Sequence, residues 1–191
     1  MTSTQEDVRT TADAIRVVFN EDWLSHSILQ RRLDQFLDLV VVCTPPTRIT
    51  GTVTIGGPEG SSTTAEQVNF PSDRDRVAEE IDFRRLSYNS PLEWIAVVGA
   101  TGTVLLGLAN KWAEVRGNLA RSKTIVRSQE VQQAALELVQ NHVREQVKDL
   151  REVARVLAEH EAQQAIRGAA ALLNDVQSIT AADDLPEAPS S

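Results

Sequence analysis

The chain has 191 residues, of which 27 are Asp or Glu and 19 are Lys or Arg, for a net charge of −8. This charge argues against general nucleic-acid binding, which needs a basic surface. Aromatic residues make up 4% of the chain, a low share that is typical of a largely helical protein rather than of a compact enzyme core. The one cysteine, Cys43, cannot form an intramolecular disulfide, which favours a cytosolic setting.

The first half of the chain predicts a small α+β domain over residues 14–90, after a flexible N-terminus at 1–13. Alternating apolar residues indicate strands, and apolar residues at spacings of three to five indicate an amphipathic helix. The expected elements are a strand at 15–19, a helix at 23–41, strands at 48–55 and 63–70, a short helix at 72–80 and a strand at 81–88. This β-α-β-β-α-β order is that of a ferredoxin-like sandwich.

An uncharged run of seventeen residues, Trp94 to Asn110, follows this domain. With Pro91 in the first turn, it predicts an apolar, Gly-rich helix over 91–111. The run would be about 25 Å long as a helix, close to the shortest that crosses a bilayer. The run is compatible with a membrane helix and with a helix buried in a soluble bundle.

Small residues and two tryptophans favour the membrane interpretation of this run. Gly99, Gly102 and Gly107 would let two helices approach closely within a membrane. Trp94 and Trp112, one at each end, would lie as anchors at the membrane interface.

The C-terminal part, residues 112–180, predicts charge-rich amphipathic helices with a heptad-like seam. The seam residues are Val139, Val143, Val147, Leu150 and Leu157. Such a seam is typical of an oligomerising coiled coil, and the alternative is a hairpin that folds back on residues 112–130. The acidic, Pro-containing tail at 181–191 is expected to be disordered.

No arrangement of reactive side chains predicts an enzyme. The loop at 56–62 is rich in glycine but lacks the Gly-Lys-Ser/Thr ending of a phosphate-binding loop. His26, His142 and His160 are far apart and show no metal-ligand spacing. We therefore expect no catalytic, cofactor-binding or metal-binding residue, and no cofactor.

Three segments resemble a loose group of uncharacterised bacterial proteins: IRVVFNEDW at 15–23, RRLDQFLDLVVV at 31–42 and RLSYNSPLEWIAVVG at 85–99. The sharpest element is SYNSPLE at 87–93. The arrangement is also similar to TRADD-N-type ferredoxin-like domains coupled to a membrane-associated helix. That resemblance implies an interaction module in bacterial defence or cell death, and it brings no catalytic residues.

Our leading hypothesis is a non-enzymatic adaptor or effector on the cytoplasmic side of a membrane, which binds protein partners and self-associates through its helices. The alternative is a soluble cytoplasmic structural or binding protein with residues 94–110 buried in a helical bundle. A third hypothesis, ranked last, is an enzyme that uses the loop at 56–62 on a phosphate.

Overall fold

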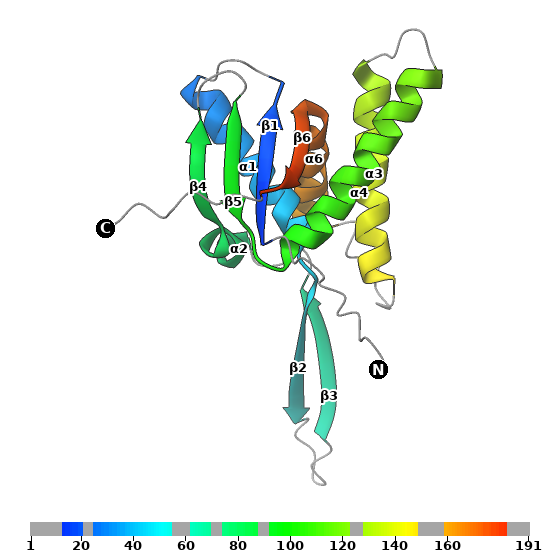
Figure 1. Cartoon of the computed structure of the whole chain (residues 1–191). Coiled ribbons are helices and arrows are strands. Elements are labelled where there is room, and N and C mark those ends of the chain that lie inside the picture. The colour runs from blue at the N-terminus through cyan, green and yellow to red at the C-terminus, as the bar shows by residue number, and fades with distance from the viewer. Residues whose placement is uncertain are drawn as a thin grey trace, which may run out of the picture.

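The computed structural model describes residues 13–20, 25–54, 62–69, 74–87, 92–122, 128–148 and 159–182. Within these residues, five helices accompany a four-stranded antiparallel sheet and a separate two-stranded hairpin (Figure 1). The predicted α+β class is therefore confirmed.

The elements follow one another along the chain and are labelled in Figure 1. They are β1 (Ala14–Phe19), α1 (His26–Cys43), β2 (Thr47–Thr54), β3 (Ser62–Asn69), α2 (Arg74–Glu80), β4 (Asp82–Ser87), β5 (Glu93–Val97), α3 (Thr101–Ser122), α4 (Ser128–Val147), α6 (His160–Asp175) and β6 (Val176–Ala181).

The main sheet has the strand order β4-β5-β1-β6, and every neighbouring pair is antiparallel. The strands β2 and β3 pair with each other instead, as a hairpin that projects from the body of the protein (Figure 1). The expectation that 48–55 and 63–70 belong to the main sheet is therefore wrong. Two β-prone segments so close in sequence pair at a small loop-closure cost, while the apolar β5 takes the place beside β1.

The uncharged run at 94–110 does not form one helix. Its first residues belong to β5, and its remainder begins α3, which continues to Ser122. Between them Gly99 has φ +55°, a left-handed conformation that glycine adopts without strain. The predicted helix over 91–111 is thus wrong, because its β-branched and aromatic start favours a strand. Within the described residues, no helix combines the length and the apolar character that crossing a membrane requires.

The region at 112–180 is helical as far as Asp175 where the structure describes it, and then changes to the strand β6. Phe19 and Val17 of β1 lie opposite Val176 and Ile179 of β6. The prediction of helix throughout this region is wrong at its end, because the β-branched sequence after Asp175 completes the sheet. The N-terminal residues 1–12 and the tail from residue 183 lie outside the described residues.

The core lies between the sheet and the helices α1 and α6, which stand together behind the sheet in Figure 1. Along β1, Ile15, Val17 and Phe19 are buried, whereas Arg16 between them is exposed. Phe19 packs against Trp94 of β5 with ring centroids 4.5 Å apart, and Phe36 and Phe83 complete this aromatic cluster. One face of the sheet is therefore buried against the helices.

The helices α1 and α6 meet at an unusually close point. The Asp38 side chain of α1 lies directly on Gly168 of α6, where an added Cβ would come 1.8 Å from Asp38 Oδ2. Arg74 of α2 reaches the same carboxylate, with its Nη2 3.4 Å from Oδ1. At the end of α6, the buried Arg32 side chain forms an ion pair with Asp175. Polar contacts thus set the spacing of these two helices.

Candidate functional site

A groove of about 510 Å³ runs between α3 and β6. Most of its α3 wall consists of small or apolar residues, and its other wall is β6 itself. The wall on α3 comprises Ala109, Asn110, Trp112, Ala113, Arg116, Gly117 and Ala120, and the remaining lining residues are Leu173 and residues 176–180. This groove brings together two segments that lie about sixty residues apart in the chain.

Two side chains of α3 hold it beside β6. The buried Trp112 donates from Nε1 to the Leu173 carbonyl oxygen at 2.6 Å. One turn later, Arg116 donates from Nη1 to the Val176 carbonyl oxygen at 3.3 Å. The last carbonyls of a helix lack partners within that helix, so Trp112 both packs in the core and satisfies one of them at the end of α6.

The outer edge of β6 carries backbone groups that the sheet does not use. Ala182 N donates to Ala14 O at 3.0 Å, which fixes the alternation of hydrogen bonds along this antiparallel pair. Thr180 and Ser178 therefore bond to β1 as well, and they lie opposite residues 16 and 18. The N–H and C=O groups of Ile179 and Ala181 point the other way, toward an edge where the described part of the chain places no further strand.

The polar side chains of the groove lining can donate and accept hydrogen bonds. Among its described residues are the hydroxyl groups of Ser178 and Thr180, the amides of Asn110 and Gln177, and the guanidinium of Arg116, with no His, Cys, Asp or Glu. A general acid or base needs a group that titrates near the working pH. The arrangement offers hydrogen bonds and apolar contacts.

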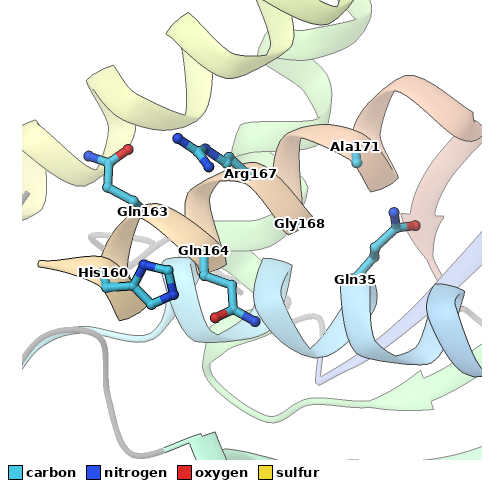
Figure 2. A pocket seen from close by; sticks show the side chains of 7 residues that line it. All are labelled: Gln35, His160, Gln163, Gln164, Arg167, Gly168 and Ala171. Carbon is cyan, nitrogen blue, oxygen red and sulfur yellow. The ribbon is translucent and has the colours of Figure 1, made fainter.

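A second hollow, of about 690 Å³, lies between α1 and α6 and is lined mainly by polar residues. Figure 2 shows that these side chains diverge. His160 and Gln164 leave α6 toward α1, whereas Gln163 and Arg167 leave it on the opposite side. They do not converge on one ligand position, so we do not assign a site there.

Three titratable groups outside the groove have shifted pKa values. Burial raises the pKa of Asp38 to about 6, against the opposing effect of Arg74. Burial also raises the pKa of the Cys43 thiol well above its usual range, which makes it unreactive. Burial and the nearby Lys111 lower the pKa of His142. Within the described part of the chain, no cluster of three or more His, Cys, Asp or Glu could hold a metal ion.

The glycines and tryptophans predicted to act in a membrane have other positions. Gly99 forms the turn before α3, and Gly102 is buried in the first turn, with its N–H bonded to Gly99 O at 2.9 Å. Gly107 is exposed, and a Cβ there would meet nothing within 4 Å, so it marks no close helix contact. Trp94 and Trp112 are 0% and 4% exposed, so the prediction of interface anchors at the ends of one helix is wrong.

The heptad-like seam is used within the chain. Val139, Val143 and Val147 are fully buried on α4, which packs against α6 and α3. This contact favours the intramolecular alternative for these residues. Leu150 and Leu157 lie outside the described residues.

Sequence reasoning missed β6 and the groove. The signal was present in VQSITA at 176–181, a short β-prone sequence directly after an alanine-rich helix. Comparisons of the chain with models of protein families, with curated proteins and with solved structures find no match in any of the three. The resemblance carried by residues 15–23, 31–42 and 85–99 stays a prediction.

Proposed function

We propose that the protein is a non-enzymatic interaction module that binds an extended segment of a protein partner as an added strand beside β6. The observation that carries this proposal is an uncharged strand edge that faces a groove with a mostly apolar wall. An unpaired edge is a ready template for another strand. Backbone hydrogen bonds then supply affinity, and pockets for alternate side chains supply specificity.

The strand order supports a ferredoxin-like description of this domain, built from other strands than the sequence predicts. With β2, β3 and the short α2 taken together as an insertion, β1, α1, β4, β5, the later helices and β6 follow the β-α-β-β-α-β order. In this numbering β1 is the first strand, β4 the second, β5 the third and β6 the fourth. From the β6 edge, the order of strands in the sheet is therefore fourth, first, third, second. The domain thus extends from β1 to β6, rather than ending near residue 90.

The groove favours a single extended segment over a helix or a second sheet. Ile179 and Ala181 offer outward hydrogen-bonding groups at the spacing of an antiparallel partner strand. Because α3 lies beside β6 (Figure 1), a segment added at this edge would lie between β6 and α3, in the groove that both elements line. Insertion into a membrane is not part of this proposal, because Trp94, Leu105 and Leu108 of the apolar run are buried in the core.

Two glycines of α3 supply a matched pair of test variants. Gly117 lines the groove, Gly107 does not, and a Cβ at either would meet nothing within 4 Å. Gly117→Leu should therefore fill the groove without harming the fold, and Gly107→Leu is its control. Both replacements remove a helix-interior glycine, so both variants should be at least as stable as the natural chain.

The experiment selects binders to the full-length protein from a displayed library of random peptides and measures their affinities for each variant. We expect Gly117→Leu to lose binding and Gly107→Leu to keep it. In amide hydrogen exchange, bound peptide should protect Ile179 and Ala181 more than Ser178 and Thr180, which already bond to β1. Peptides that bind both variants equally, and that leave Ile179 and Ala181 unprotected, would overturn the proposal.

A further inference from the structure

We infer that the partner segment runs antiparallel to β6 and carries a carboxylate at its C-terminal end, where it meets Arg116. This inference rests on the proposed function and names the chemistry of the partner. The carboxylate can come from an Asp or Glu side chain or from a C-terminus, since both present the same group to a guanidinium.

Arg116 is the charged residue among the described lining of the groove. A guanidinium has five N–H donors in a planar fork, and the bond to Val176 O uses one of them. The lining described above contains no Asp or Glu to take up the others. A carboxylate from outside would complete this fork, and a bidentate pair of this kind adds geometric specificity as well as affinity.

The direction of the segment decides which of its ends meets Arg116. The Val176 carbonyl at the start of β6 already accepts from Arg116, so the new ladder of hydrogen bonds ends at that point. A strand antiparallel to β6 runs from the Ala181 end toward Val176, and its C-terminal residue therefore arrives beside the guanidinium. Antiparallel pairing is also the arrangement of every other pair in the sheet.

The alternative is that Arg116 only ties α3 to β6, and the test must separate the two roles. Peptides enriched on the full-length protein are synthesised in matched forms: with a free C-terminus, with an amidated C-terminus, and with Asp or Glu replaced by Asn or Gln. Each form is titrated against the natural chain, Arg116→Gln, Arg116→Lys and Arg121→Gln. Arg121 is an exposed residue near the end of α3 that does not line the groove, so its variant controls for loss of charge.

For the natural chain we expect removal of the carboxylate to weaken binding by about tenfold, the usual value of a charge-assisted hydrogen bond. Arg116→Gln should bind both forms equally, Arg116→Lys should keep part of the preference, and Arg121→Gln should behave as the natural chain. The preference should also shrink as salt is added. The free and amidated forms then tell whether the group is a C-terminus or a side chain.

The outcomes distinguish this inference from the proposed function beneath it. Equal binding of acidic and neutral peptides by the natural chain, with Ile179 and Ala181 still protected, overturns the carboxylate and leaves strand addition standing. A preference for the acidic peptide that persists in Arg116→Gln overturns the role of Arg116 and likewise leaves strand addition standing. A competing occupant is the acidic tail of a second copy, residues 183–191. If the chain self-associates and removal of this tail abolishes the self-association, a separate partner is overturned as the occupant.

Discussion

The two edges of the sheet differ in how they meet solvent. Along β4, Asp82, Arg84 and Arg85 place charges at the edge, with an ion pair of 2.7 Å between Arg84 and Asp82. The pairing of β4 with β5 also shifts register between Phe83 and Arg85. Charges and bulges are the usual means by which proteins prevent unwanted strand pairing. By contrast, β6 carries no charge in its six residues.

The helices near these two edges also differ in the charge of their contacts. Beside α1, Arg74 of α2 is shared by Asp34 and Asp38, with distances of 3.3 and 3.4 Å. Next to β6, Trp112 and Arg116 of α3 instead contact backbone carbonyls. A cluster of charges thus surrounds Arg74 on α2, whereas the groove beside β6 has a mostly apolar wall on α3 with Arg116 as its charged residue. Under the proposed function, β6 is the edge that a partner strand would join.

The largest expected effect comes from removing the residue that holds the open flank together. Trp112→Ala should lower the free energy of unfolding by about 3–5 kcal/mol, because it leaves a cavity in the core and removes the partner of Leu173 O. It should also abolish peptide binding, since α3 loses its anchor beside β6. Urea denaturation measures the first effect, and titration with an enriched peptide measures the second.

Phe83→Ala is the counterpart of that variant on the β4 flank. Phe83 is half-buried in the aromatic cluster, so its replacement should cost less stability and leave peptide binding intact. Equal loss of binding in the two variants would show that the flanks do not act separately.

A smaller effect, and one that depends on pH, is expected at Asp38. Burial places its pKa in the folded protein at about 6, above the ordinary value of 3.8. The folded state therefore binds a proton more tightly than the unfolded state, and stability falls as pH rises from about 4 to 6. Asp38→Asn should remove this fall and stabilise the protein at pH 7 by about 2–3 kcal/mol relative to the natural chain.

Denaturation curves measured between pH 4 and pH 7 on the natural chain and on Asp38→Asn test this prediction by their difference. Asp34→Asn is the matched control, because Asp34 contacts the same Arg74 but has a side chain that is 64% exposed. Its effect should stay below about 1 kcal/mol. A difference between natural chain and Asp38→Asn that does not change with pH would contradict the assignment.

Local patterns predicted several elements well, and strand pairing accounts for the main errors. The strand at 15–19, the helix at 23–41 and the strand at 81–88 have close counterparts in β1, α1 and β4. Their periodicity is set by which face is buried, and that information is local. The choice of neighbours in the sheet depends on segments far apart. The sequence therefore predicts β2 and β3 correctly as strands but places them in the wrong sheet, and it assigns the β5 segment to a helix. A short apolar run reads equally well as a strand or as a buried helix.

The candidate site was beyond prediction for a related reason. Its two walls, residues 109–120 and residues 176–180, come together through tertiary packing. Gly117 lies inside α3, where glycine is usually unfavourable, yet in the fold it leaves space beside β6. Gly168 has a different role, since its missing side chain makes room for Asp38. The same residue type thus serves a groove at one position and close packing at another.

Removing the charges of β4 should give the smallest change in stability. It also tests most directly whether charge is what distinguishes the β4 edge from the β6 edge. Replacing both Arg84 and Arg85 by Thr should change the free energy of unfolding by about 1 kcal/mol or less, because both lie at the sheet edge. It should nevertheless increase self-association with rising protein concentration, as followed by analytical ultracentrifugation. Arg76→Thr on α2 removes an exposed charge of the same kind away from the edge, and it should remain as dispersed as the natural chain. If the double variant also stays dispersed, the register shift at Phe83 protects β4 without help from charge, and the uncharged sequence of β6 would no longer distinguish it as the pairing edge.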